Sequence, residues 1–146
     1  MKRLFLIICL MSLLVPGCSG EETYPASDQG VDVDFSALNS IMAQAALNNI
    51  ARHSADYIGK TIKVRGAYYS IFPEQTGQHY HYVTIVDGDA CCRQGFEFRF
   101  TDDKTYPDDY PDENEVIEVI GVLGRYEEFG SAYLYLAVDE ITVLIQ

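Results

Sequence analysis

The chain contains no tryptophan, only four cysteines and few basic side chains. Its 146 residues carry 10 Lys and Arg against 22 Asp and Glu, which gives a formal net charge of −12. A field of that sign repels the phosphate backbone of nucleic acids and anionic lipid surfaces, so we expect no nucleic-acid partner. The same acidic surface keeps a domain soluble and attracts cations or basic partners.

Long hydrophobic runs are missing beyond the amino-terminal segment. Two basic residues precede an apolar run over residues 4–15, which is typical of a signal peptide. Residues 15–18, VPGC, resemble a bacterial lipobox, with Pro16 where Ser or Ala is usual. The resemblance implies a signal peptide over residues 1–17 and a lipid on Cys18. The expected location is extracytoplasmic, with Cys18 anchoring the chain to the bacterial cell membrane.

The segment after the lipobox separates the anchor from the folded domain. Residues 18–35 are polar and aperiodic, which predicts a flexible tether. The domain is predicted to span residues 36–146 and to open with a helix that runs from Ser36, as N-cap, to about His53. Apolar and small residues recur there at helical spacing and predict a face packed on the body. These residues are Leu38, Ile41, Met42, Ala45, Ala46, Asn49 and Ile50.

After this helix the apolar period changes to two, the period of β-strands. Strands are predicted over residues 61–72, 78–87, 95–101, 116–126, 132–138 and 141–145. An acidic loop over residues 102–114 divides them, and a solvated surface is favoured there over a weak calcium site. Short strands with interior glycines such as Gly66 and Gly121 indicate a small barrel. The predicted fold class is mainly β, a five- to six-stranded barrel preceded by one α-helix.

Three segments carry a resemblance to a known fold. GKTIKVRGAYYSI, EVIEVIGVLGRYEE and YLAVDEITVL look like strands of an OB-fold. They are similar to the tRNA-anticodon-like OB domains of uncharacterised bacterial lipoproteins, over roughly residues 57–145. The resemblance implies an OB-like domain at the cell envelope and carries no catalytic signature. The acidic loop stands where an OB-fold usually has a helix between its third and fourth strands.

Two adjacent cysteines, Cys91 and Cys92, remain after the signal and the lipidation site are set aside. With His79 and His81 they supply four ligands of the types that zinc prefers. The spacing departs from C-x2-C, however, and about ten residues separate the two pairs. We therefore expect no cofactor and keep zinc as the alternative. A thiol-redox role and cysteines packed as small hydrophobes also stay open, and solvent-facing histidines are favoured over ligation.

Motifs of common enzyme classes are missing, including Gly-x-Ser-x-Gly, P-loop and Rossmann patterns, so we expect no catalysis. Tyrosine is abundant instead, with 11 in the chain. Aromatic barrel surfaces stack sugars, bases or protein side chains, although about half of the strand tyrosines are expected to fill the barrel. The expected function is a membrane-anchored, non-catalytic module that binds a protein or a small ligand. The alternative is a metal-binding or thiol-redox protein using Cys91 and Cys92.

Overall fold

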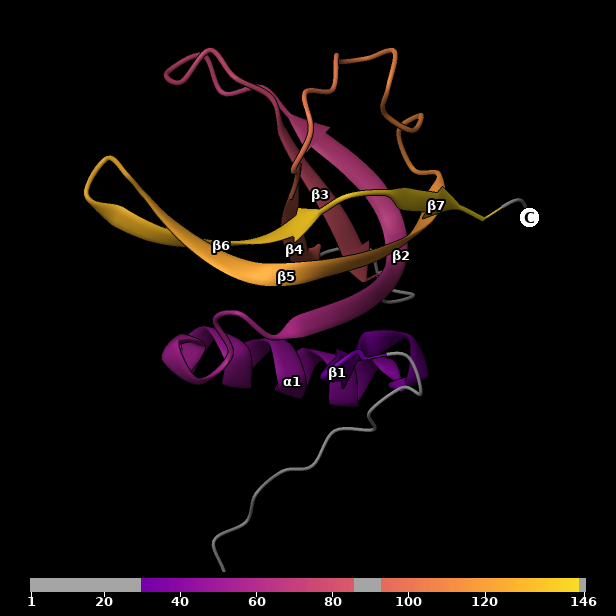
Figure 1. Ribbon diagram of the computed structural model, residues 1–146, viewed down its shortest axis with the longest axis vertical. Helices are drawn as coiled ribbons and strands as arrows, with labels where there is room; N and C mark the ends of the chain where they lie inside the picture. The colour runs from indigo at the N-terminus through magenta and orange to yellow at the C-terminus, as the bar shows by residue number, and fades with distance from the viewer. Residues whose placement is uncertain (1–29, 86–92, 145–146) are drawn as a thin grey trace, which may run out of the picture.

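The computed structural model describes residues 30–85 and 93–144, and these form a mainly β domain with one α-helix (Figure 1). The helix α1 spans Ser40–Arg52. The strands are β1 Val33–Asp34, β2 Thr61–Ile71, β3 Tyr80–Ile85, β4 Gln94–Phe100, β5 Val116–Glu128, β6 Ser131–Val138 and β7 Ile141–Val143. No helix within these ranges is long and apolar enough to cross a membrane.

Five of the strands pair in a partial ring. Strand β2 pairs antiparallel with β3, β3 antiparallel with β4, and β4 parallel with β6. Strand β6 then pairs antiparallel with β5, and β5 antiparallel with β2. The short strand β1 pairs with Ile62 and Lys63 near the start of β2. The short strand β7 pairs with residues 117–119 near the start of β5. The structure confirms the predicted fold class as far as a mainly β domain with one helix.

The core follows the period-two pattern of the sequence. Ile62, Val64 and Tyr68 on β2 are buried, as expected for alternate residues that face the interior. Gly66 belongs to the same face, where a Cβ atom would collide with the backbone carbonyl of Thr84. The backbones of β2 and β3 therefore approach too closely at this position for any residue but glycine.

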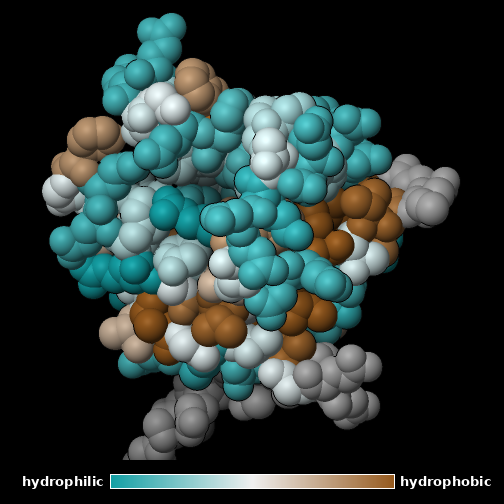
Figure 2. All heavy atoms as spheres, turned by 45° about the horizontal axis from the view of Figure 1, so that its top comes forward, coloured by the Kyte–Doolittle hydropathy of each residue, from teal (hydrophilic) through white to brown (hydrophobic). Residues whose placement is uncertain are grey.

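The helix α1 lies across one end of the ring, and the loop over residues 101–115 lies at the other (Figure 1). Figure 2 shows that hydrophilic residues cover most of the face at the loop end, with hydrophobic ones gathered in its lower half. Strand β5 runs unbroken from Val116 to Glu128, whereas the sequence suggested an interrupted strand that ends at residue 126.

Residues 31–35 correct the predicted tether. Val31, Val33 and Phe35 are buried, and Val33 pairs with Ile62 in a short parallel ladder. Three apolar residues at alternate positions are enough to bury one face of this short segment. Among polar neighbours, a pattern this short is not recognised as a strand from the sequence. The prediction that the tether extends to residue 35 was therefore wrong over residues 31–35. The signal peptide, Cys18 and the rest of the tether lie outside the described residues.

The helix also begins later than predicted. Asn39, not Ser36, is the N-cap, and its side chain accepts a hydrogen bond of 3.0 Å from the Met42 N–H. Burial falls on Ala43, Ala46 and Ile50, a stripe whose two small residues let the helix lie close to the core. The prediction of a buried Ile41 and Met42 was wrong, since these side chains are 80% and 50% exposed.

Candidate functional site

The strongest candidate site is a cleft between the β2–β3 loop and the β5–β6 hairpin, called here the tyrosine cleft. Its volume is about 350 Å³. Its lining residues are Ile71, Pro73, Gln75, Thr76, Tyr80, Tyr82, Tyr126, Glu128, Phe129 and Tyr133. Aromatic walls with a few converging polar groups are typical of ligand sites.

Strand register explains why tyrosines gather here. Tyr80 and Tyr82 are two residues apart on β3 and therefore share a face. Tyr82 pairs with Glu97 on β4, and Glu97 pairs in turn with Tyr135 on β6. The neighbouring hairpin pairs Tyr126 with Tyr133, whose rings stack 5.3 Å apart. The pair Tyr126–Tyr133 also contacts Tyr135, because the ring of Tyr126 lies 5.9 Å from that of Tyr135.

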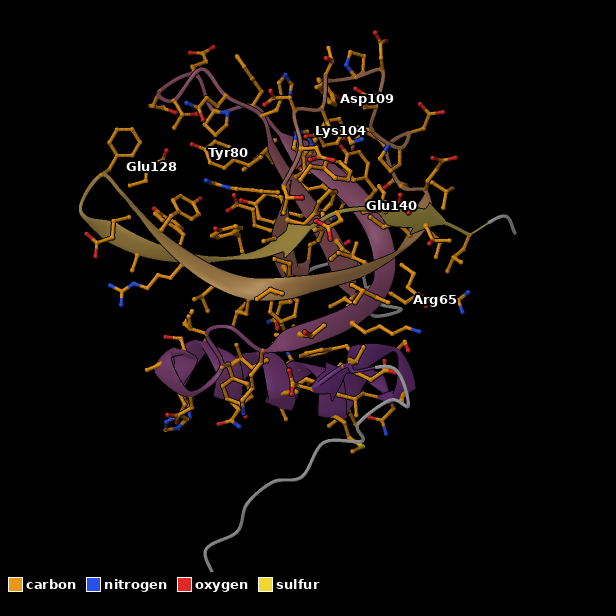
Figure 3. The ribbon with its side chains drawn as sticks, in the orientation of Figure 1. Arg65, Tyr80, Lys104, Asp109, Glu128 and Glu140 are labelled. Atoms are coloured by element: carbon orange, nitrogen blue, oxygen red, sulfur yellow. The ribbon has the colours of Figure 1, made fainter. Side chains whose placement is uncertain are left out.

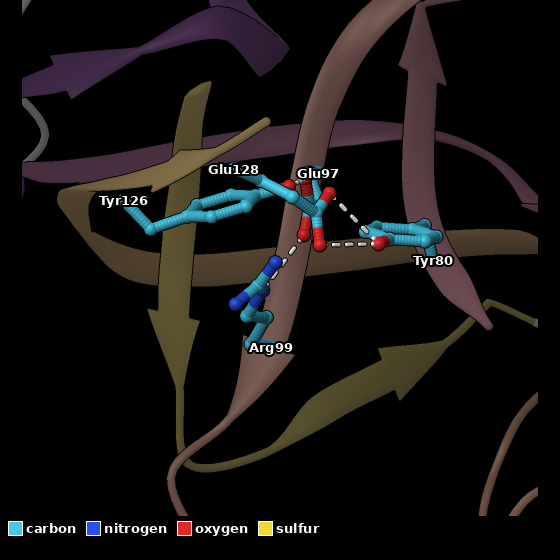
Figure 4. Close-up of polar contacts among 5 residues, drawn as sticks. All are labelled: Tyr80, Glu97, Arg99, Tyr126 and Glu128. Atoms are coloured by element: carbon cyan, nitrogen blue, oxygen red, sulfur yellow. Dashed lines mark hydrogen bonds and ion pairs between the residues drawn. The ribbon is translucent and has the colours of Figure 1, made fainter. Parts of the chain in front are cut away.

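A neutralised charge pair lies beneath this surface. Glu97 is 5% exposed, and its Oε1 accepts a 2.7 Å hydrogen bond from Arg99 Nε (Figure 4). Its Oε2 accepts a 2.8 Å hydrogen bond from the Tyr126 hydroxyl. The Arg99 guanidinium also lies 3.7 Å from the centre of the Tyr126 ring, in cation–π contact. Glu97 is thus a buried carboxylate whose charge is met by a cation and a hydroxyl.

These contacts shift the tyrosine pKa values upward. Burial raises the pKa of Tyr82 to about 12, and the negative charge of Glu97 adds to the effect. Burial and the hydrogen bond to Glu97 likewise raise the pKa of Tyr126. Both side chains are therefore neutral hydrogen-bond donors at physiological pH.

Glu128 is the second carboxylate and has different surroundings. Both of its carboxylate oxygens lie 2.8 Å from the Tyr80 hydroxyl, and the two side chains point toward each other (Figure 3). Among the described residues three ion pairs form: Lys63–Glu118, Arg99–Glu97 and Arg125–Glu127. None of them includes Glu128, so the wall of the cleft carries a negative charge that has no cationic partner within residues 30–85 and 93–144.

The hairpin beside Glu128 ends in an unusual turn. Glu128 pairs with Ser131, which leaves Phe129 and Gly130 as the two central residues. Their φ angles are 49° and 76°, as in a type I′ turn, where Asn-Gly is preferred. A phenylalanine in this left-handed region is strained, and its side chain is 76% exposed. An exposed aromatic in a costly conformation therefore stands at the mouth of the tyrosine cleft.

Comparisons with protein-family models, with curated proteins and with solved structures found no match to this chain. A larger cavity, of about 460 Å³, lies between α1 and β4. Its lining is mostly apolar, and Arg93 is the one charged residue among the described residues that form it. The tyrosine cleft combines aromatic walls with converging polar groups and is the stronger candidate.

The two predicted histidine ligands differ in environment. His81 is 7% exposed on β3, with Nδ1 2.7 Å from the Tyr68 hydroxyl and its ring stacked 3.9 Å from that of Tyr110. Burial, with a contribution from His79, lowers the pKa of His81 to about 4. The prediction of a solvent-facing side chain was wrong for His81, because β3 turns this residue toward the core.

His79 is exposed, as predicted, and precedes β3. Its ring lies between those of Phe72 and Tyr106, with centres 4.7 Å and 4.1 Å away. The two imidazole rings are 6.1 Å apart. Residues 30–85 and 93–144 contain no group of three or more His, Cys, Asp or Glu side chains that could hold a metal ion. Cys91 and Cys92 lie outside the described residues, so the zinc and thiol-redox alternatives stay predictions.

Sequence reasoning found the tyrosines but missed the residues that make them a site. Glu97 alternates with Phe96 and Phe98 along β4 and so lies on the opposite face, yet it is buried there among tyrosines. Glu128 and Phe129 received no role. The available signal was the tyrosine repeat at alternate positions, Tyr80 and Tyr82 on one strand and Tyr133 and Tyr135 on another.

Proposed function

We propose that this chain is a non-catalytic binding module with an OB-like barrel, and that its ligand occupies the tyrosine cleft. The order of strand pairing supports the fold part of the proposal. The ring β2-β3-β4-β6-β5 contains four antiparallel pairs and the parallel pair β4–β6. Numbered by ring strand alone, this order is 1-2-3-5-4, returning to 1, which is the connectivity of an OB barrel.

The position of the tyrosine cleft supports the binding role. OB-folds bind ligands on the face of their second and third strands, between the loop that joins strands 1 and 2 and the loop that joins strands 4 and 5. Here those strands are β3 and β4, and those loops are the β2–β3 loop and the turn at Phe129 and Gly130. The tyrosine cleft takes lining residues from β3 and from both loops, and none of its lining residues belongs to β4. The observation that carries the proposal is this coincidence of place with a 350 Å³ aromatic cleft.

The chemistry of the lining favours binding over catalysis. The ten residues that line the tyrosine cleft include no Ser, Cys, His or Lys side chain. The one Thr hydroxyl, on Thr76, already donates a 3.1 Å hydrogen bond to the Pro73 carbonyl. Tyrosine rings supply broad, rigid contact area at a low cost in conformational entropy. The ligand is a protein or a small molecule, because the net charge of −12 opposes nucleic acid.

The location is part of the same proposal. The lipobox-like residues 15–18 support a lipid on Cys18 and an extracytoplasmic module held at the cell membrane. Labelling of the full-length protein with radioactive palmitate in a bacterial host tests this. Cys18→Ser is expected to abolish the label and Cys9→Ser to retain it. Equal labelling of both variants would show that Cys18 is not the anchor.

The binding role is tested by photo-crosslinking of the full-length protein in cells. A photoreactive phenylalanine analogue replaces Tyr133 in the cleft or, as a control, the 80%-exposed Ile41 on α1. A specific adduct, with a protein or a small molecule, is expected from position 133 and not from position 41. Equal adducts at both positions, or none at position 133, would contradict the proposal.

A further inference from the structure

We propose that the tyrosine cleft contains a subsite for an organic cation, an alkylammonium or guanidinium group, with Glu128 as its counter-charge. This inference rests on the proposed function and names the chemistry that the cleft selects. It covers two sources of the same group, a free amine and a basic side chain of a partner protein.

The first argument is the unequal state of the two carboxylates. Glu97 is balanced by Arg99 at 2.7 Å, whereas Glu128 has one hydroxyl partner and no cation among the described residues. A neutral ligand that excluded water from Glu128 would leave a desolvated charge without a counter-ion, which is costly. A cationic ligand supplies that counter-ion and adds its own attraction.

The second argument is that the same face already holds one cation by the same means. The Arg99 guanidinium lies 3.7 Å from the centre of the Tyr126 ring and 5.2 Å from that of Tyr135, and it bonds a carboxylate. The cleft repeats this combination with Glu128 as the carboxylate. Aromatic rings line the cleft together with that carboxylate, from Tyr80, Tyr82, Tyr126, Phe129 and Tyr133. Aromatic rings beside a carboxylate are the usual means of binding ammonium and guanidinium groups.

The third argument is the conformation of Phe129. Its φ of 49° strains the turn, and 76% of the residue is exposed. Asparagine would relieve the strain and remove the apolar surface, so the ring at this position costs stability. A ring at the mouth of a cleft that contains Glu128 explains that cost, because it supplies a wall for a bound cation.

The test titrates the full-length protein, in non-ionic detergent, with probes of defined charge. The chain has no tryptophan, so tyrosine fluorescence follows the titration, and two-dimensional amide NMR locates the response because only four of the 11 tyrosines line the cleft. The cationic probes are Nα-acetyl-lysine amide, Nα-acetyl-arginine amide and spermidine. The neutral probe is Nα-acetyl-norleucine amide. At least one cation is expected to bind tenfold or more tightly than the neutral probe, with NMR shifts at Tyr80, Glu128 and Tyr133.

The cationic probes separate the two sources. Preference for the lysine or arginine amide points to a basic side chain of a partner protein, and preference for spermidine points to a free polyamine. Either preference supports the cation subsite. Equal binding of the neutral and cationic probes, or cation-induced shifts confined to residues outside the cleft, would overturn it.

Matched variants assign the effect to Glu128. Glu128→Gln is expected to weaken binding of the preferred cation about tenfold. The control is Glu127→Gln, which removes the charge of the neighbouring residue. Glu127 is exposed and forms an ion pair of 3.1 Å with Arg125. Phe129→Asn is expected to weaken cation binding severalfold while it raises the melting temperature, which separates a lost contact from a damaged fold. Equal losses in the two glutamine variants would overturn the assignment.

The results also separate this inference from the function on which it rests. If crosslinking from position 133 succeeds and no cation binds preferentially, the cation subsite is wrong and the binding module stands. If crosslinking at that position also fails, both proposals are wrong.

Discussion

Two aromatic clusters take side chains from opposite faces of β3, and they are built for different purposes. At the end covered by the acidic loop, the rings of Tyr68, His81 and Tyr110 pack around a buried hydrogen bond of 2.7 Å. In the tyrosine cleft, aromatic rings line an open volume together with Glu128, a carboxylate that has no cationic partner in the part of the chain that the structure describes. Both clusters take residues from β3, at His81 and at Tyr80.

The difference shows that residue type alone does not define a site. The histidine cluster contains the side chains that the sequence offers to a metal, yet His81 is buried against Tyr68 as part of the core. The tyrosine cleft contains ordinary strand residues, yet it leaves free volume and unbalanced charge. Buried polar groups that hydrogen-bond each other indicate a structural role, as in the Tyr68–His81 pair, whereas open volume beside a charge with no cationic partner among the described residues indicates a binding role.

The largest expected effect on stability comes from disrupting the buried cluster of Tyr68, His81 and Tyr110. Tyr68 is 1% exposed, so Tyr68→Ala is expected to lower the free energy of unfolding by about 3–5 kcal/mol through cavity formation. Tyr133 is 42% exposed, and Tyr133→Ala is expected to cost only about 1 kcal/mol. Urea denaturation measures both. Similar losses would show that the two clusters do not differ as described.

The second-largest expected effect is the pH dependence of stability that His81 contributes. The pKa of His81 is about 4 in the fold and about 6.5 in the unfolded chain, so between these values the unfolded state binds the extra proton. Stability is therefore expected to fall as pH decreases from 6.5 to 4, by about 3 kcal/mol in total at 1.36 kcal/mol per unit. Above pH 6.5 this residue adds no pH dependence.

Urea denaturation across this pH range checks the contribution of His81. His81→Asn is expected to lose it, whereas the exposed control His79→Asn keeps most of it, because burial is the larger cause of the lowered pKa of His81 and His79 the smaller. An unchanged pH profile in His81→Asn would assign the acid sensitivity to other groups.

Two carboxylates that are each paired with a cation, Glu97 and Glu118, differ in structural importance. Glu97→Gln leaves the partly buried Arg99 without its counter-charge and is expected to cost about 1–2 kcal/mol, a value reduced because Arg99 is partly solvated. Glu118→Gln, in the more exposed pair with Lys63, is expected to cost less than about 0.5 kcal/mol. Thermal unfolding ranks them, and a larger loss for Glu118→Gln would be contrary evidence.

The smallest effect has the opposite sign. Phe129→Asn is expected to raise the free energy of unfolding by about 0.5–1 kcal/mol, because asparagine adopts positive φ with less strain. Ser131→Ala, next to the same turn, is a control expected to change stability by less than about 0.5 kcal/mol. Calorimetry of both variants decides, and destabilisation by Phe129→Asn would show that the exposed ring supports the turn.

Much of the β architecture was predictable from local pattern. Alternation placed Ile62, Val64 and Tyr68 on the inner face of β2, because a strand alternates its faces whatever its neighbours are. The exposed Ile41 and Met42 were not predictable in this way, because burial on a helix depends on which stripe meets the sheet. The prediction of a solvent-facing His81 was wrong for a similar reason. Both faces of β3 carry a mixture of apolar and polar residues, so only packing against the rest of the domain selects the buried face.

The sequence by itself determined the net charge, the period-two strands and the turn positions, because each depends on residues near one another in the chain. Only the tertiary structure decided the candidate site. Tyr80 bonds Glu128 across 48 residues of chain, and Tyr126 bonds Glu97 across 29. The long-range pairing of β3, β4, β5 and β6 brings these groups together, and no local pattern carries that information.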